Sequence, residues 1–565
     1  MIAVRTPPPP PCRRSKTKTT TTAASAAVVI VNHLSPPTAI DNHHRSPPWT
    51  AATTTVAAAI GRHHRGVADR RLIKTPAHDG NAEAQPPPPS LPRTNKPPPP
   101  PPPTTANGVK TPPPPPAAGD SSSKNTAAAI AFACLITLDI VILITVLHII
   151  LSKTAFLNGK LTEDVYMEQP EGFVDPKNPD KVCKLLKSIY GLKQASRSWN
   201  LHFDERIKEF GFAKSEFEPC VYTKFSGSIV TFLVLYVDDI LLIGNDVPTL
   251  QSVKSWLSRC FQMKDLGEVA YILGIKIYRN RSKRLIGLSQ GTYIDKILKR
   301  FRMDESKKGF IPMQHGIVLS KSQCPVSSQD QDRMKSVPYA SAIGSIMFAM
   351  LCTRPDVAYS VSVTSRYQQN PGEPHWVAVK NILKYLRRTK DMFLVFGGSE
   401  DEISVTGYSD ASFQTDRDDF RSQSGYVFTL NGGAISWKSS KQDTIADSTT
   451  EAEYIAASDA AKEAVWLRNF LSDLRVVASV SRPIDIFCDN SGAVAQAKEP
   501  REHRKSRHVL RKYHLIREII GRGDVRICKI PTEENVADPL TKPLARVKHE
   551  AHANSIGMQY LEASS

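Results

Sequence analysis

The sequence predicts a protein of the α+β or α/β class, with folded domains that follow a long N-terminal region of different character. The chain has 565 residues, which is enough for two or three domains. From Lys153 onward, strand-like runs such as IVTFLVLY alternate with helical stretches such as VAVKNILKYLRRT. Before about residue 125, proline, alanine, threonine and serine fill most positions, so the folded domains are expected downstream.

Residues 1–125 are predicted to be a disordered proline-rich region. Prolines cluster at 7–11, 86–89, 97–103 and 112–116. Proline runs lack backbone donors and favour an extended polyproline II helix, so no core can form there. The alternative is that these runs are ligands for SH3- or WW-like domains.

Residues 126–151 contain the apolar run AAAIAFACLITLDIVILITVLHIIL, whose 25 residues are enough to span a bilayer. Asp139 near its centre costs about 2.5–3.5 kcal/mol in a membrane, which the many Leu, Ile and Val residues outweigh. We therefore expect a transmembrane helix over 127–151, with membrane localisation if the segment inserts. The alternative is a buried core segment of the next domain.

Charge and cysteine usage narrow the function class. The formal net charge of +18 favours a polyanionic partner such as nucleic acid or an acidic membrane surface, and the alternative is a basic tail. The nine cysteines show neither C-x-x-C spacing nor the density of a disulfide scaffold. They are expected to be buried apolar residues in a reducing compartment.

The sharpest local feature is TFLVLYVDDILLIG, residues 231–244, in which Asp238 and Asp239 interrupt a strongly β-prone run. A strand, two acids and a second strand predict a hairpin with carboxylates at its tip. Adjacent like charges repel each other unless cations bind them, which favours a metal site. The alternative is an ordinary Asp-Asp turn.

Residues 152–310 resemble the reverse transcriptase of copia-type retrotransposons. The resemblance is carried by SKTAFLNGKLTEDVYMEQPEGF (152–173), KLLKSIYGLKQASRSWN (184–200), the hairpin, and MKDLGEVAYILGIKI (263–277). It implies a right-hand palm in which Tyr236, Asp238 and Asp239 belong to the metal hairpin. It also implies that Tyr190, Lys193 and Gln194 lie beside the nucleotide and template.

This sequence departs from its family at one catalytic position. Copia-type enzymes carry the first catalytic aspartate two residues before the lysine of KTAFLNG, where this chain has Leu151. Asp139 lies too far upstream to replace it, and the fingers region is expected to be replaced by the proline-rich segment. Phosphoryl transfer needs a third carboxylate that bridges both metals. We therefore expect an incomplete palm without polymerase activity.

Residues 311–400 resemble the connecting, thumb-like segment of the same family. The apolar positions recur at helical spacing around VAVKNILKYLRRT. Lys384, Arg387, Arg388 and Lys390 form a basic run that could contact nucleic-acid phosphates. A solvated helix face is the alternative.

Residues 401–545 place four acids at the ends of predicted elements. The predicted strand ISVTGYSDASF carries Asp410, Glu453 lies in the first turns of a helix, Asp489 ends the strand IDIFC, and Asp538 lies near a helix start. Asn431-Gly432-Gly433 is predicted to form a hairpin turn. Taken alone, each acid would be interpreted as an ordinary surface carboxylate. Taken together and in this order, the four acids resemble the ribonuclease H layout of copia-type elements.

That resemblance implies Mg²⁺ or Mn²⁺ at the four acids and hydrolysis of RNA in an RNA–DNA hybrid by a two-metal mechanism. Glu451 is an alternative to Glu453. The histidine that precedes the last acid in bacterial enzymes is absent, because Pro531 and Thr532 occupy that region.

A basic helix is predicted over 503–518, ahead of the last acid. The residues expected to grip the hybrid backbone are Arg504, Lys505, Arg507, Arg511 and Lys512. Val509, Tyr513 and Ile516 are expected to face inward, and a solvated basic face is the alternative. Residues 546–565 are expected to be a C-terminal tail.

Three interpretations follow from the sequence. The first is a copia-type Pol fragment with a competent nuclease and a disabled polymerase, located in the cytoplasm or nucleus. The second is a catalytically inactive retroelement relic. The third is a membrane-anchored proline-rich fusion product. The sequence contains no protease, zinc-knuckle or integrase motif, so other retroelement proteins are expected to act in trans.

Overall fold

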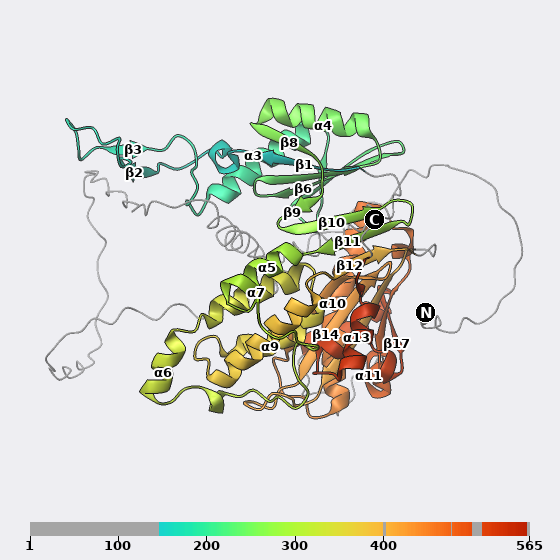
Figure 1. Ribbon diagram of the computed structural model, residues 1–565. Helices are drawn as coiled ribbons and strands as arrows, with labels where there is room; N and C mark the ends of the chain where they lie inside the picture. The colour runs from blue at the N-terminus through green and yellow to red at the C-terminus, as the bar shows by residue number, and fades with distance from the viewer. Residues whose placement is uncertain (1–145, 399–402, 476, 500–510, 562–565) are drawn as a thin grey trace, which may run out of the picture. The chain divides into compact units, whose positions relative to one another are not determined.

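The computed structural model describes residues 146–398, 403–475, 477–499 and 511–561 (Figure 1). Two compact units contain them: one comprises 146–153 and 207–561, and the other comprises 154–206. The predicted proline-rich region, residues 1–125, and residues 127–145 of the apolar run lie outside the described residues.

The unit of residues 154–206 is built around one small hairpin. Strand β2 (Tyr166–Glu168) pairs antiparallel with β3 (Val182–Lys184). The short helix η1 (Ala155–Asn158) precedes them, and most of α3 (Ala195–Glu209) follows.

In the larger unit, the first sheet has six strands and carries the acidic hairpin. Its spatial order is β4-β5-β6-β7-β1-β8, with all neighbours antiparallel. The bounds are β1 (Val146–Ser152), β4 (Ala213–Lys214), β5 (Val221–Ser226), β6 (Ile229–Tyr236), β7 (Asp239–Gly244) and β8 (Met263–Glu268). Helix α4 (Val247–Cys260) follows β7 and contacts both β7 and β8.

The predicted transmembrane helix is wrong over its last residues, because Val146–Ser152 forms strand β1. This strand lies between β7 and β8 and hydrogen-bonds to both, so its apolar side chains belong to the core of the sheet. Leu147, Ile149 and Ile150 are buried, and each such burial contributes roughly 1.5–3 kcal/mol. A long apolar run cannot distinguish a membrane helix from a buried segment, and the buried alternative holds here.

The middle of the chain combines a second sheet with a group of helices. The sheet order is β18-β12-β11-β10-β9. The bounds are β9 (Tyr271–Ile272), β10 (Ile275–Asn280), β11 (Leu285–Ser289) and β12 (Phe393–Gly397), and the helices are α5 (Gly291–Arg300), α6 (Ser328–Lys335), α7 (Tyr339–Cys352), α8 (Ala358–Thr364) and α9 (Glu373–Thr389). Helices α5, α7 and α9 share one apolar core.

No helix among the described residues is by itself long and apolar enough to cross a membrane. Helices α6 and α7 meet the length and composition test only as a pair bent by 47°.

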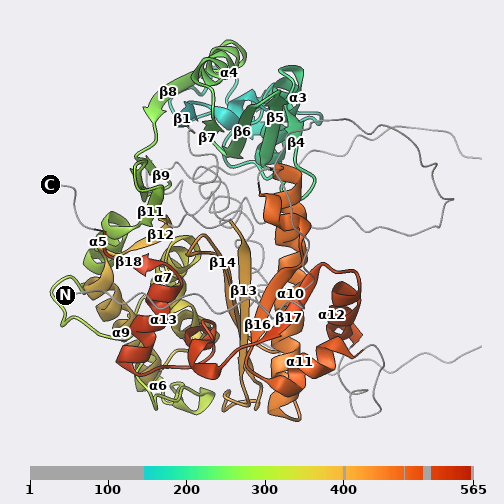
Figure 2. The ribbon, with the colours of Figure 1, turned by 90° about the vertical axis from the view of Figure 1, so that its right-hand side faces the viewer.

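The third sheet carries the remaining acids and has the order β15-β14-β13-β16-β17 (Figure 2). β13 (Val405–Ser412), β14 (Gln423–Leu430) and β15 (Gly433–Lys441) pair antiparallel, whereas β16 (Ile484–Cys488) and β17 (Val525–Lys529) extend the sheet in parallel. The long helix α10 (Thr449–Leu474) packs on β13, β14 and β16, and α12 (Arg511–Gly521) packs on α10. This is the strand, hairpin, helix and strand order that the sequence predicts.

The predicted hairpin turn is confirmed. Asn431 and Gly432 connect β14 to β15, and both have positive φ, at 49° and 84°. A two-residue hairpin turn of this kind requires left-handed backbone at both positions, which Asn and Gly tolerate best.

The last residues are integrated into the second sheet. Helix α13 (Arg546–Ser555) leads to β18 (Met558–Gln559), which pairs with β12. His549 of α13 donates to the Asp356 carbonyl oxygen at 3.2 Å, and the Asp356 carboxylate accepts hydrogen bonds from Arg354 and Tyr385. The segment expected as a tail is therefore held by a buried polar network.

Candidate metal centre

Parallel pairing of β13 with β16 brings Asp410 and Asp489 together. The register aligns Ser409 with Cys488, so the next residue on each strand is an aspartate. Carboxyl ends of parallel strands meet at one edge of a sheet, so the two side chains can converge there. Asp410 is buried and Asp489 is half-buried.

Helix α10 places Glu453 near Asp489, whereas the Glu451 carboxylate turns toward the start of the helix. The Ser448 side chain caps the helix by accepting from the Glu451 amide at 3.2 Å. The Glu451 carboxylate turns back to accept from the Asp447 amide at 2.9 Å. Glu453 lies over β13 instead, where its Oε1 accepts from the Ala411 amide at 3.1 Å.

Asp538 starts the short helix η8 (Asp538–Leu540) and is fully buried. Asn535 fastens this segment to β13, because its Nδ2 donates to the Ser409 carbonyl oxygen at 3.0 Å. The Thr541 hydroxyl donates to Asp410 Oδ2. These two bonds hold the last acid against the strand that carries the first.

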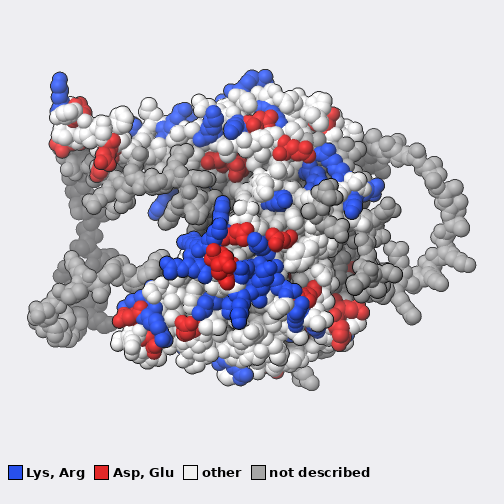
Figure 3. All heavy atoms as spheres, viewed as in Figure 1, with Lys and Arg blue, Asp and Glu red and all other residues white. Residues whose placement is uncertain are grey.

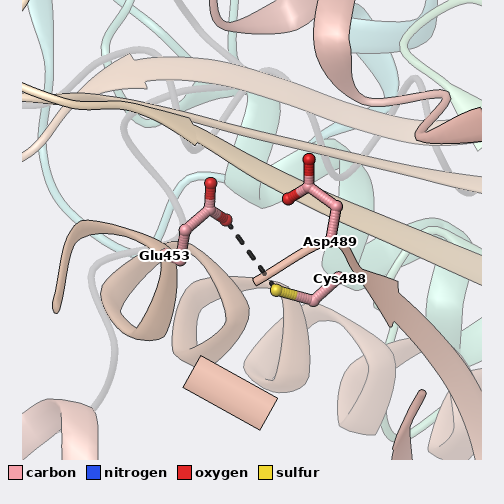
Figure 4. A group of neighbouring side chains, drawn as sticks. All are labelled: Glu453, Cys488 and Asp489. Atoms are coloured by element: carbon pink, nitrogen blue, oxygen red, sulfur yellow. Dashed lines mark hydrogen bonds between the residues drawn. The ribbon is translucent and has the colours of Figure 1, made fainter. Parts of the chain in front are cut away.

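The four acids form two overlapping groups of potential metal ligands. Asp410, Asp489 and Asp538 place one ligand atom each within 4.8 Å of one another, as do Glu453, Cys488 and Asp489. Figure 4 shows the carboxyl groups of Glu453 and Asp489 extending from α10 and from the end of β16, with the Cys488 sulfur beside Glu453. The Cys488 thiol donates to Glu453 Oε2 at 3.8 Å.

The donor set fits a hard divalent cation. Burial raises the pKa of Asp410 to about 6, and nearby Asp538 and Asp489 add to the effect against the opposing charge of Lys542. Burial, followed by Asp410 and Asp489, raises the pKa of Glu453 well above its usual value. Clustered carboxylates of this kind favour a cation, and oxygen ligands suit Mg²⁺ or Mn²⁺.

The second predicted site is the hairpin between β6 and β7. Tyr236 pairs with Asp239, while Val237 and Asp238 form the turn. Val237 has φ of 53°, which is strained for a β-branched residue and is typical of functional turns. Burial and then Asp238 raise the pKa of Asp239 to about 6.

Leu151 lies directly across from this hairpin. Strand β1 pairs with β7 so that Leu151 is the partner of Asp239, and the Ser152 amide donates to the Asp238 carbonyl oxygen at 2.7 Å. The position at which the resemblance implies an aspartate is thus beside the acidic pair, and this chain has Leu151 there.

The predicted nucleic-acid-binding residues differ in what the structure shows. In the smaller unit, Lys193 and Tyr190 are exposed, and Gln194 donates to Glu163 Oε1 at 2.8 Å. Arg504, Lys505, Arg507 and Val509 lie outside the described residues, and only the backbone of Arg511 and Lys512 is described, at the start of α12. The inward orientation predicted for Tyr513 and Ile516 is confirmed by their burial.

Lys and Arg gather on the face shown in Figure 3, over the region of α5, α7 and α9 in Figure 1. Three cations from the predicted basic run have acidic partners: Arg387 with Glu305, Arg388 with Glu550, and Lys390 with Asp295. These ion pairs partly neutralise the positive charge of the run. Its side chains are therefore less suited to strong contacts with nucleic-acid phosphates.

Sequence reasoning missed four residues of the centre: Cys488, Asn535, Thr541 and Lys542. Lys542 Nζ lies 2.9 Å from Asp538 Oδ1 and 3.7 Å from Asp410 Oδ2. Thr541 and Lys542 follow Asp538 by three and four residues, so helical spacing could have indicated them. Asn535 and Cys488 depend on tertiary contacts that no local pattern predicts.

Comparisons with known proteins give a consistent assignment. The family described as reverse transcriptase (RNA-dependent DNA polymerase) matches residues 128–315. The retrovirus-related Pol polyprotein from transposon TNT 1-94 of Nicotiana tabacum is 46% identical over 407 residues, which are 72% of this chain but 30% of that protein. The putative transposon Ty5-1 protein of Saccharomyces cerevisiae is 35% identical over 312 residues, which cover 98% of it.

One solved structure with similarity is a ribonuclease H1 isolated from compost. It is 19% identical, with coverage of 24% of this chain and 92% of that chain and a TM-score of 0.17.

The carboxylate cluster predicts a pH-dependent response to metal. Because folding raises the pKa of Asp410 from 3.8 to about 6, the metal-free chain loses stability, on the order of 2–3 kcal/mol, as pH rises from about 4 to 6. A divalent ion that bound the ionised carboxylates would restore this stability. We expect Mg²⁺ to raise the thermal midpoint more at pH 8 than at pH 5, as measured by calorimetry. Equal shifts at both pH values, or an unchanged pH difference in Asp410→Asn, would contradict the prediction.

The position of Leu151 predicts the effect of restoring a carboxylate. Leu151→Asp places a third acid beside Asp239, which should lower the metal-free free energy of unfolding by roughly 1–3 kcal/mol through desolvation and repulsion. Added Mn²⁺ should restore most of the lost free energy of unfolding. The matched variant Leu151→Asn should be destabilised without metal-dependent recovery beyond that of the wild type. Recovery in both variants, or in neither, would show that position 151 does not complete a metal site.

Proposed function

Because this chain belongs to the family of copia-type retrotransposon Pol polyproteins, we propose that its last third hydrolyses the RNA strand of RNA–DNA hybrids. The observation that carries the proposal is the convergence of Asp410, Glu453, Asp489 and Asp538 from two parallel strands, one helix and one short turn. The chain spans 30% of the length of the tobacco relative, so the proposal is argued from the residues of this chain and not from the activity of the whole relative.

In this proposal the four acids hold Mg²⁺ or Mn²⁺. Bound divalent ions lower the pKa of water and stabilise the leaving oxygen of a phosphodiester. The protein residues do the positioning. Asn535 and Thr541 fix the separation of Asp538 and Asp410, while the buried sheet edge and α10 keep bulk water from Glu453.

We further propose that the polymerase site is disabled. Two acids on one hairpin cannot replace the third carboxylate that bridges the metals. The supporting observation is the register that pairs Leu151 with Asp239. The palm-like sheet would then serve as a scaffold and a nucleic-acid contact instead of a catalytic domain.

The competing proposal is a relic that binds hybrid without turnover. Its support is that a lysine ammonium lies beside each Asp538 carboxylate oxygen: Lys548 donates a hydrogen bond to Oδ2 at 2.8 Å, and Lys542 forms an ion pair with Oδ1 at 2.9 Å without hydrogen-bond geometry. A carboxylate that is neutralised in this way is a weaker metal ligand. Direct measurement of cleavage separates the two proposals.

The full chain should cleave the labelled RNA strand of a hybrid when Mg²⁺ or Mn²⁺ is present. Asp410→Asn should lower the rate by at least about 100-fold, because even outer-shell partners of a metal can contribute that much. Asp485→Asn is the matched control. Asp485 lies on β16, the strand that leads to Asp489, but its carboxylate forms an ion pair with Arg526. No cleavage by folded protein that retains hybrid binding would favour the relic.

Primed RNA templates test the polymerase. The full chain should extend no DNA primer under conditions in which it cleaves hybrid, because Leu151 leaves the palm without a third carboxylate. A gel assay of primer length measures this directly. Extension that disappears in Asp238→Asn would refute the disabled polymerase.

A further inference from the structure

Lys542 lies where a cation between two of the acids would lie. Its Nζ is 2.9 Å from Asp538 Oδ1 and 3.7 Å from Asp410 Oδ2. Both carboxylates are buried, whereas the lysine side chain is 34% exposed, so its stem reaches inward from the surface. The backbone fixes its base, because the Lys542 amide donates to the Asp538 carbonyl oxygen at 3.3 Å.

The two ends of the acidic cluster differ in their partners. On the Asp538 side, Lys542 and Lys548 bind one oxygen each, and Thr541 donates to Asp410. On the Glu453 side, no ion pair recorded among the described residues reaches the carboxylate of Glu453 or Asp489. The Glu453 carboxylate has neutral partners, the Ala411 amide and the Cys488 thiol, and the nearby Lys529 ammonium donates to the Asp489 backbone carbonyl oxygen and not to a carboxylate.

An ammonium and a divalent ion cannot share the space between Asp410 and Asp538. The Lys542 ammonium already lies in this space, 2.9 Å from Asp538 Oδ1 and 3.7 Å from Asp410 Oδ2. A metal ion that enters this gap must displace the Nζ and break its ion pair with Asp538. No such displacement is needed between Glu453 and Asp489.

We propose that Lys542 is a built-in cation that reserves the Asp410–Asp538 gap, so the chain binds one divalent ion tightly and a second one weakly. The tight ion is held at the Glu453–Asp489 side. The second enters only when Lys542 withdraws. Lys542 is thus a positioning residue that sets metal stoichiometry, and this inference rests on the proposed nuclease site.

Counting bound Mn²⁺ tests this proposal without reference to activity. Free Mn²⁺ is measured by electron paramagnetic resonance as the metal is titrated into the full chain. The wild type should show one tight site and a weaker one, and Asp489→Asn should weaken both. Lys542→Met should tighten the second site by about 5- to 150-fold, the usual range for coupling between sites.

Three variants separate the position of the charge from its mere presence. Lys542→Gln is a second neutral replacement, in case Lys542→Met does not fold. Lys542→Arg keeps a cation in the gap and should leave the second site weak. Lys548→Met removes a charge from the other oxygen of Asp538 and should change the second site less than Lys542→Met does.

Each outcome has a defined meaning. Two equal sites in the wild type, or equal tightening by Lys548→Met and Lys542→Met, would overturn the inference. Absence of any Asp489-dependent Mn²⁺ binding would overturn it together with the proposed metal centre. One tight site that becomes two in Lys542→Met, without RNA cleavage by either protein, would support the inference while the nuclease proposal fails.

Discussion

The parallel pairing of β13 with β16 is the constraint on which the rest of the centre depends. Its register makes Asp410 and Asp489 neighbours at one edge of the sheet. A slip of one residue would turn one of the two carboxylates to the opposite face, because side chains alternate along a strand. Every other part of the centre responds to that pair: α10 contributes Glu453, and Asn535 and Thr541 bind the last acid to β13. The same alignment brings the negative charges close together, and Lys542 and Lys548 lie beside them.

Much of the fold could be predicted because its signals are local. Two aspartates between the β-prone runs of TFLVLYVDDILLIG predict a hairpin, and Asn431-Gly432 predicts a two-residue turn, since both depend on neighbouring residues alone. The four acids can be proposed as a group from the sequence because each lies in or beside a predicted element and their order matches the resemblance. The last part of the apolar run, which forms β1, differs from the predicted membrane helix for the opposite reason. Its hydrophobicity is equally suited to lipid and to the interior of a sheet, and only its pairing with β7 and β8 decides between them.

The choice between Glu451 and Glu453 shows which details of the site can be predicted from the sequence. Both acids lie in the first turns of α10, and the preference for Glu453 came from the resemblance. The structure adds a difference in location: the Glu451 carboxylate binds the Asp447 amide at the helix start, whereas the Glu453 carboxylate lies beside β13 and Asp489. Lys542 could not be weighed from the sequence, since its importance lies in a 3.7 Å approach to a residue far away in the chain. The alignment of Leu151 with Asp239 likewise needed a strand register that no local pattern provides.

The pairing of β18 with β12 has a consequence for how the chain reaches its fold. Strand β12 precedes the whole carboxylate-bearing sheet in the sequence, and β18 follows it, so their contact closes one very long loop. Closing such a loop carries an entropic cost and slows folding when it must come early. During synthesis β12 emerges long before its partner exists. The third sheet can therefore assemble before β18 is synthesised, and the pairing of β18 with β12 then ties the two ends of this long segment together.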